Sequence, residues 1–487
     1  MNASGTTTRM VRGGLWIAGL RIVSRLVGLA NIMILARLLT PKDFGLFSIV
    51  ALALSILTAF SETGMNTALV HEKDDIRNYL DTAWTIQAAR GVILCVILIS
   101  ASPLITWFFD KPESAPLIYV MGLSPLLRGF QNIGVVFFQK ELQFKKQFFL
   151  QSFPCLISAV IGIGAAFILR NAWALVIFSV TNSGLETVGS YFLHSYRPRL
   201  DFEVSEARHL FNFGKWMLVT KMVKYLLLRG DSIFVGRMAG ITILGYYQLA
   251  MKISQLPADQ IGAGLAWITF PAYSKLQRDI PRLRNAWLRT IEMATIIAFP
   301  ICAGILILAP EIVHTILGKQ WLPSIPVLRV LSVLALLKII GNFGSIFQAL
   351  GKPKIIAQIS LLRLVALVTL IYPFYVGLQA TGVALAAVTA TLITQPIALA
   401  RTLSLLKCSL ASFFRAIIAG IFASVLMIYI LFVIKNWISA TSPAMLCVLL
   451  VAGASSYICG LLLLDLITGN RKTITLASEI IASFRSQ

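Results

Sequence analysis

Residues 15–39 read LWIAGLRIVSRLVGLANIMILARLL, an apolar stretch that is long enough to cross a bilayer as a helix. Arg21 and Arg25 lie near its middle. At 1.5 Å per helical residue, Arg25 is about 15 Å from Leu15, which is close to the bilayer midplane. A charge at that depth costs at least ~2.5 kcal/mol on insertion scales. The stretch therefore predicts a spanning helix whose two arginines face something other than lipid.

The composition is that of a polytopic membrane protein. Of 487 residues, 57% are hydrophobic and only 13% are charged, and the mean hydropathy is +0.83. Soluble globular proteins carry about 25% charged residues, so that class is excluded. The net charge of +22 fits basic anchors in cytoplasmic loops and does not require a nucleic-acid partner. The six cysteines and four histidines are scattered, so we expect no metal site and no cofactor.

Windows of about 20 apolar residues predict fourteen spanning helices in an all-α protein. They lie near 14–37, 44–64, 80–107, 115–138, 147–169, 172–194, 210–235, 243–270, 286–309, 325–350, 355–376, 380–401, 412–434 and 443–467. With the N-terminus in the cytoplasm, 22 Lys and Arg fall in cytoplasmic segments and 7 fall on the opposite side. This bias predicts that both termini are cytoplasmic. The connections are too short to hold a soluble active site, so we do not expect an enzyme.

The chain also contains an internal repeat. An offset of 200 residues pairs Gly14 with Gly214, Trp16 with Trp216, Arg37 with Arg237, Gly45 with Gly245 and Gly64 with Gly264. An offset of 210 gives seven identities within residues 116–137, with Arg128 opposite Lys338. Each copy holds six spans, so both insert with the same orientation and a pseudo-twofold axis runs along the membrane normal. We predict an N-terminal lobe over 1–194, a cytoplasmic linker over 195–209, a second lobe over 210–401, and two further helices and a tail over 402–487.

Four stretches resemble a known family. ARLLTPKDFGLFSIVALA (36–53), RPRLDFEVSEARHLFNFGKW (197–216), LGYYQLAMKI (244–253) and ALGKPK (349–354) are similar to sequences of the polysaccharide transporter family. This family contains lipid-linked oligosaccharide flippases and belongs to the multidrug/oligosaccharidyl-lipid/polysaccharide exporter superfamily. The resemblance implies two six-helix lobes arranged as a V around a central cavity, with alternating access. It also implies a bacterial inner-membrane protein whose substrate is undecaprenyl diphosphate carrying an oligosaccharide, with polysaccharide polymerases as possible partners.

The resemblance also suggests which charges bind the substrate. In the superfamily the first two helices of each lobe line the cavity, and these correspond here to spans 1, 2, 7 and 8. Arg21 and Arg25 share one face of span 1, and Lys221 and Lys224 share one face of span 7. We expect these four residues to bind the diphosphate. The alternative is that they pair with acids or extend toward the interface.

Carboxylates inside the spans are candidates for binding a coupling proton or sodium ion. Glu62 and Asp259 rank first because they lie on the predicted cavity helices, and Asp231 lies on span 7. A salt bridge to a neighbouring base is the alternative role for each.

Two other functions compete with a flippase. A cation-coupled multidrug exporter of the same superfamily would bind cationic drugs, which a cavity holding these four bases would repel. A membrane glycosyltransferase or polymerase would need catalytic carboxylates or histidines in a sizeable outer loop, and none of the predicted loops is large enough.

Overall fold

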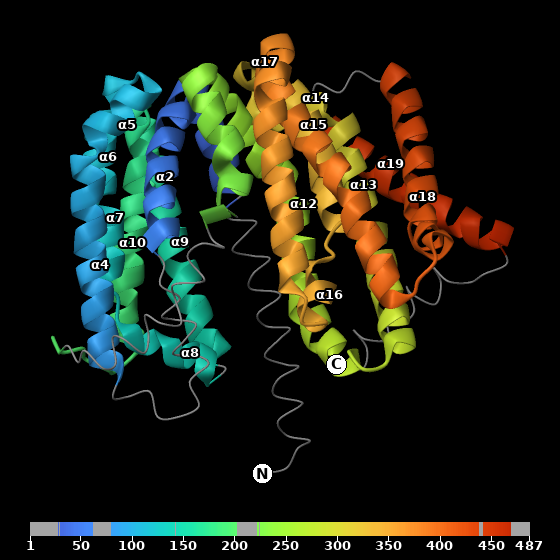
Figure 1. Ribbon diagram of the computed structural model, residues 1–487. Coiled ribbons are helices and arrows are strands. Elements are labelled where there is room, and N and C mark those ends of the chain that lie inside the picture. Colours follow the sequence, from blue (N-terminus) through green and yellow to red (C-terminus); the bar gives the residue numbers. More distant parts are fainter. Residues whose placement is uncertain are drawn as a thin grey trace. The chain divides into compact units, whose positions relative to one another are not determined.

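The computed structural model describes residues 28, 30–61, 79–141, 143–201, 222–223, 225–437 and 442–468. Every secondary-structure element in these residues is helical (Figure 1). Helical residues overlap each of the fourteen predicted windows, and eight helices in the described part are long and apolar enough to cross a membrane. The prediction of an all-α polytopic membrane protein is therefore confirmed. The number fourteen and the symmetry of the lobes stay predictions.

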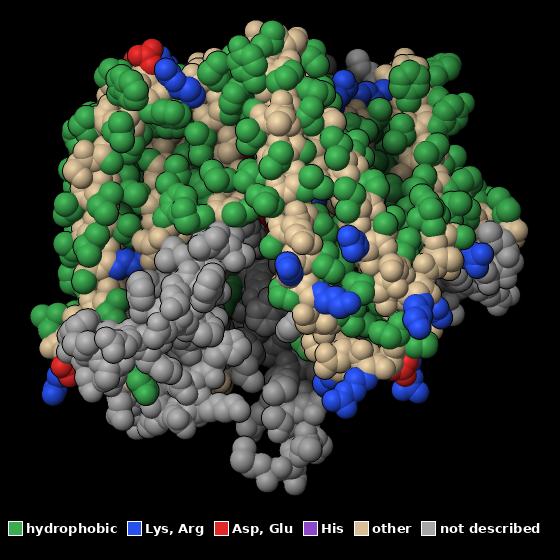
Figure 2. Space-filling model, in the orientation of Figure 1, with side chains coloured by type: hydrophobic (Ala, Val, Ile, Leu, Met, Phe, Trp, Pro, Cys, Tyr) green, Lys and Arg blue, Asp and Glu red, His purple; other side chains and the backbone are tan. Residues whose placement is uncertain are grey.

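The chain divides into two compact units, residues 1–245 and 246–486. The division lies inside α12, so the start of this helix belongs to the first unit. The lobe boundaries predicted from the sequence stay a prediction. Hydrophobic side chains cover most of the described surface that faces the viewer, and Lys and Arg form separate patches at its upper edge and over its lower half (Figure 2).

The first unit is built on a few pairs of packed helices. Its elements are α2 (Pro41–Ser61), α4 (Leu80–Ser100), α5 (Ser102–Phe109), η2 (Pro112–Ser114), α6 (Ala115–Met121), α7 (Leu123–Gly129), η3 (Ile133–Val135), α8 (Val136–Lys140), α9 (Phe144–Leu169) and α10 (Trp173–Leu193), followed by helical residues 225–238. The helix α9 packs along α10, and α7 lies between α4 and α10. A core cluster of Leu80, Trp84, Ile133 and Val136 joins α4 to the segment after α7.

The predicted span over 115–138 is broken in the structure. Its helices α6 and α7 are followed by a non-helical turn at residues 130–132 and by the short elements η3 and α8. The Asn132 side chain caps η3 by accepting a hydrogen bond from Gly134 N at 2.9 Å, and Asn132 N donates to Ser190 Oγ at 2.9 Å. These bonds satisfy backbone groups that a helix break would otherwise leave unpaired.

The second unit places α13 at the centre of its packing. Its elements are α12 (Ile241–Leu276, from Tyr246 onward), α13 (Ile280–Ile307), α14 (Ala309–Ile312), η4 (Val313–Leu317), η5 (Lys319–Ser324), α15 (Ile325–Ile340), α16 (Gly344–Ala349), α17 (Pro353–Leu406), α18 (Leu410–Trp437) and α19 (Pro443–Thr468). The helix α13 packs against α15 and α18, and α18 packs against α19. Trp287 of α13 is buried and stacks on Phe413 of α18, with ring centroids 5.8 Å apart.

The element α17 consists of two helical segments joined at a kink. At 1.5 Å per residue its 54 residues would extend about 80 Å, whereas the hydrocarbon core is about 30 Å thick. Gln379 has a non-helical backbone (φ 49°, ψ −132°) that separates the two halves. This break lies between the windows predicted over 355–376 and 380–401, so the structure places the turn where the sequence predicts it.

The helices α2 and α12 cross at two glycines of the first unit. A methyl group on Gly45 would overlap the backbone carbonyl of Ile241, and a methyl group on Gly245 would overlap the carbonyl of Pro41. The two contacts are reciprocal, because Ile241 lies 200 residues after Pro41 and Gly245 lies 200 residues after Gly45.

Candidate functional site

The structure describes only two of the seven residues that the sequence singles out. Asp231 and Asp259 lie in described helices, and Arg21, Arg25, Glu62, Lys221 and Lys224 lie outside the described residues. The roles assigned to these seven residues stay predictions. What the structure adds is the arrangement of the polar groups around the two described carboxylates.

Asp259 lies on a polar face of α12. Lys252, Gln255 and Asp259 follow the i, i+3, i+7 spacing that places side chains on one side of a helix. Lys338 of α15 reaches this face, with its Nζ 3.2 Å from Gln255 Oε1. The Asp259 side chain is exposed, and no residue in the described part forms an ion pair with it. Because lipid contact would be costly for a carboxylate, this face of α12 suits a water-filled space.

Asp231 has a different environment. It is 4% exposed, and its Oδ1 accepts hydrogen bonds from Ser232 N at 2.6 Å and from Ser232 Oγ at 3.2 Å. These bonds hold the carboxylate against its own helix, residues 225–238. Of the two described carboxylates, Asp259 is therefore the exposed one.

Polar side chains of α2 connect it to neighbouring helices of the first unit. Ser55 Oγ lies 2.7 Å from the hydroxyl of Tyr225, which also donates to the Leu52 carbonyl at 3.2 Å. Arg90 of α4 donates to Ser61 Oγ at 3.0 Å and to the Thr58 carbonyl at 3.3 Å. Arg90 thus binds the C-terminal half of α2.

Several other intramembrane bases have protein partners. Arg128 pairs with Glu186 at 3.4 Å, and Arg363 Nε donates to Thr394 Oγ1 at 3.3 Å. Together with Arg90 and Lys338, these residues fit the alternative in which a base in a predicted span pairs with groups of neighbouring helices. A base in a predicted span therefore does not by itself mark the substrate site.

In each copy of the repeat, the backbone carbonyl at an equivalent position accepts a hydrogen bond from a side chain of another helix. The Leu127 carbonyl of α7 accepts a hydrogen bond from Thr187 Oγ1 at 2.8 Å. The Leu337 carbonyl of α15, 210 residues later, accepts one from Gln395 Nε2 at 3.0 Å. Each donor lies on the helix that ends its copy of the repeat. Equivalent helices are thus tied together in each unit.

The residues after α10 form a strap, residues 194–201, that the sequence reasoning missed. The Tyr196 hydroxyl donates to Asp81 of α4, and Arg199 N donates to the same oxygen at 2.7 Å. Asp201 N donates to Thr85 Oγ1 at 3.2 Å. Burial and the bond to Asp81 raise the pKa of Tyr196, which keeps its hydroxyl protonated as a donor. Residues 197–201 of the strap begin the stretch RPRLDFEVSEARHLFNFGKW, one of those that carry the family resemblance.

Comparison with known proteins agrees with the family resemblance of the sequence. A family model described as "Polysaccharide biosynthesis protein" matches residues 34–326. The lipopolysaccharide biosynthesis protein WzxC of Escherichia coli (strain K12) is 25% identical over 350 residues, which is 71% of each chain. The succinoglycan biosynthesis transport protein ExoT of Rhizobium meliloti (strain 1021) is 22% identical over 338 residues, covering 69% of this chain and 68% of that protein.

Solved structures share the fold. The lipid II flippase MurJ in an inward closed conformation covers 93% of this chain and 99% of its own, with a TM-score of 0.76 and 15% identity. An inward-facing multidrug resistance MATE family transporter of the MOP superfamily covers 79% and 96%, with a TM-score of 0.63 and 18% identity. The family model covers more than half of the sequence and the helical architecture agrees with it, so the chain belongs to the polysaccharide biosynthesis protein family and is a multi-pass membrane protein.

Proposed function

We propose that this protein moves undecaprenyl-diphosphate-linked oligosaccharide units from the inner to the outer face of the bacterial inner membrane. The units would serve the assembly of a surface polysaccharide such as capsule, exopolysaccharide or O-antigen. Transport proceeds by alternating access of a central cavity lined by spans 1, 2, 7 and 8. Arg21, Arg25, Lys221 and Lys224 bind the diphosphate, and both termini lie in the cytoplasm.

The polar face of α12 is the observation that carries the proposal. A helix with the spacing of Lys252, Gln255 and Asp259 cannot present all three side chains to lipid without a large cost. A hydrated cavity accommodates them, and a diphosphate and its sugars require hydrated polar surroundings within the membrane. The names of the relatives, which refer to lipopolysaccharide and succinoglycan biosynthesis, support the class of substrate.

The test is a deletion strain complemented with the intact gene. We expect the deletion to abolish the surface polysaccharide and to leave its lipid-linked oligosaccharide on the inner face of the membrane. Extracted lipid-linked intermediates are quantified by mass spectrometry, and their side is assigned by labelling in intact and opened spheroplasts. If the intermediates accumulate on the outer face, the step that fails is polymerisation and the proposal is wrong. Lost resistance to cationic drugs with normal polysaccharide would favour a multidrug exporter.

Asp259 is expected to couple transport to an ion gradient. Asp259→Asn removes the charge from an exposed carboxylate that no described residue pairs with, so the variant should insert and fold normally. Transport in proteoliposomes should fall at least tenfold and lose its dependence on a pH or sodium gradient. Asp231→Asn is the comparison, because that buried carboxylate is bound to its own helix and its loss should affect folding first. A normal gradient response in Asp259→Asn would remove this residue from the coupling step.

A further inference from the structure

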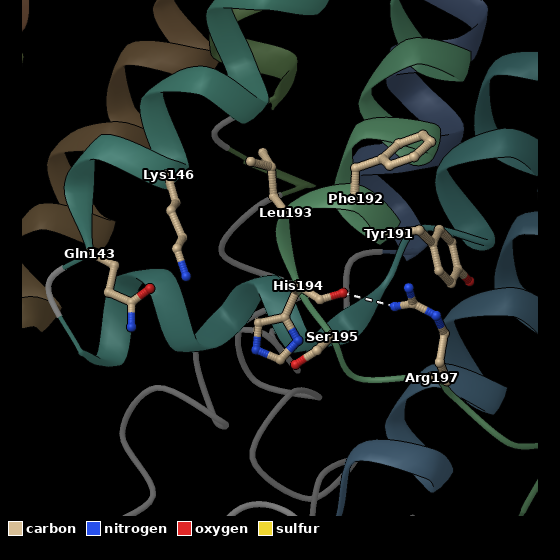
Figure 3. Close-up of a pocket in the computed structure, with 8 residues that line it drawn as sticks. All are labelled: Gln143, Lys146, Tyr191, Phe192, Leu193, His194, Ser195 and Arg197. Carbon is tan, nitrogen blue, oxygen red and sulfur yellow. Dashed lines mark hydrogen bonds between the residues drawn. The ribbon is translucent and has the colours of Figure 1, made fainter.

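A pocket of about 400 Å³ opens where α9 begins and α10 ends. Lys146 lies on one side of His194 and Arg197 lies on the other (Figure 3). Gln143, Tyr191 and Ser195 complete its polar wall. The loop charges predict that this end of the helices is cytoplasmic, because Lys140, Lys145, Lys146 and Arg199 gather there. The pocket is therefore at the level of the inner-leaflet headgroups.

Neither cation of this pocket, Lys146 or Arg197, is paired with a carboxylate of the described residues, and the nearby Glu141 instead accepts a hydrogen bond from Gln143 Nε2 at 2.6 Å. Lys146 Nζ lies over the ring of Phe138 at 5.6 Å, and Arg197 Nη1 donates to the His194 and Tyr196 carbonyls at 2.8 and 3.0 Å. The remaining guanidinium N–H groups and the ammonium group are left to bind an oxyanion.

His194 is held in place as a further donor. Its Nδ1 accepts a hydrogen bond from Tyr196 N at 3.1 Å, so the neutral ring carries its proton on Nε2. The ring stacks on Phe137 with an interplanar angle of 5° and rests against Gly134, where a methyl group would overlap it. The imidazole is thus fixed between the two cations by packing and a hydrogen bond.

An apolar track leads from the pocket into the membrane. Lys146, Phe149, Phe153, Leu156 and Val160 follow the spacing that places them on one face of α9. The four apolar side chains are exposed, and Val160 is 72% exposed. Phe192, which also lines the pocket, is 85% exposed. A cationic pocket above an exposed apolar stripe matches the two ends of a phospholipid.

We propose that this pocket binds the headgroup phosphate of an anionic phospholipid of the inner leaflet, with the acyl chains along the exposed face of α9. Basic pockets between helices on the cytoplasmic side are suited to anionic lipid headgroups. The site lies outside the residues proposed to bind the transported substrate, so it would be occupied by a resident membrane lipid.

The experiment measures lipid binding to the purified full-length protein by native mass spectrometry. Phosphatidylglycerol is the probe, with phosphatidylethanolamine as the zwitterionic reference. We expect the wild-type protein to prefer phosphatidylglycerol. The double variant Lys146→Gln, Arg197→Gln should weaken its binding about thirtyfold, which corresponds to about 2 kcal/mol for two charges.

The matched control is Lys145→Gln, Arg199→Gln, which changes the net charge equally with two exposed bases that do not line the pocket. It should retain phosphatidylglycerol, as should the charge-preserving swap Lys146→Arg, Arg197→Lys. The lipid-free melting temperature of each variant reports its folding. Equal weakening in the control pair would overturn the proposal, because it would show nonspecific surface attraction. Displacement of the lipid by millimolar inorganic phosphate would overturn it as well, because it would show a site for a free anion.

Discussion

Replacement of Gly45 or Gly245 by alanine is expected to destabilise the protein by about 3 kcal/mol, the upper end of the usual cost of overpacking. The added methyl group meets a backbone carbonyl in each case, that of Ile241 or of Pro41. A backbone carbonyl cannot rotate away as a side chain can, so the two helices must separate. The measurement is the melting temperature of the purified variant, together with its monodisperse fraction in detergent.

The matched control for this prediction is Gly304→Ala in α13. A methyl group there meets no atom within 4 Å, and alanine is the better helix former by up to about 1 kcal/mol. Its melting temperature should be unchanged or higher. If Gly45→Ala and Gly245→Ala melt at the wild-type temperature, the close crossing of α2 and α12 is not a stabilising contact. Equal losses in the two variants are expected, because each glycine faces the equivalent carbonyl of the other copy.

The double variant Arg21→Ala, Arg25→Ala is expected to insert but to reduce oligosaccharide export at least about a hundredfold. The expected reduction in export follows from the loss of two charge-assisted hydrogen bonds to phosphate, each of which contributes about 1.5–3 kcal/mol. Lipid-linked oligosaccharide should remain on the inner face of the membrane. Arg→Lys at both positions should retain part of the activity, since the charge remains while the bidentate geometry is lost. Lys221→Ala should behave like the arginine variants, because Lys221 occupies the position in the second copy of the repeat that is equivalent to Arg21.

Protein level separates this role from a structural one. A buried ion pair that loses one partner leaves the other uncompensated, which is strongly destabilising. If the alanine variants are degraded or aggregate, the two arginines are structural. Normal export by a stable double variant would exclude them from substrate binding altogether. Membrane fractions are therefore quantified beside the lipid-linked intermediates in every strain.

The sequence predicts the helices well because hydrophobic windows report length and burial directly. It predicts less well where a helix ends inside a window. The turn after Gly129 depends on Gln87 Nε2, which donates to the Arg128, Gly129 and Gln131 carbonyls at 3.0–3.2 Å, and no local pattern reveals a partner 41–44 residues away.

The sequence likewise does not reveal which groups pair with the intramembrane charges. Both Arg128 and Glu186 appear in the sequence as isolated charges within predicted spans, and only the packing of α7 against α10 brings them together. The exposure of Asp259 also depends on tertiary packing. For Arg21 and Arg25, charge spacing and family resemblance remain the arguments, since they lie outside the described residues.

The strap over residues 194–201 has a consequence for biogenesis. Its bonds to Asp81 and Thr85 join positions more than 110 residues apart, and every one of its donors is synthesised after α10. The strap can therefore form only when α4 and α10 have both left the translocon and packed with α7 between them. Domains fold from the N-terminal side during synthesis, so this closure would precede insertion of the following helices. Closing so long a loop costs about 2 kcal/mol more in entropy than closing a ten-residue loop. We therefore expect the strap to close on the first set of helices while the second set is still being translated.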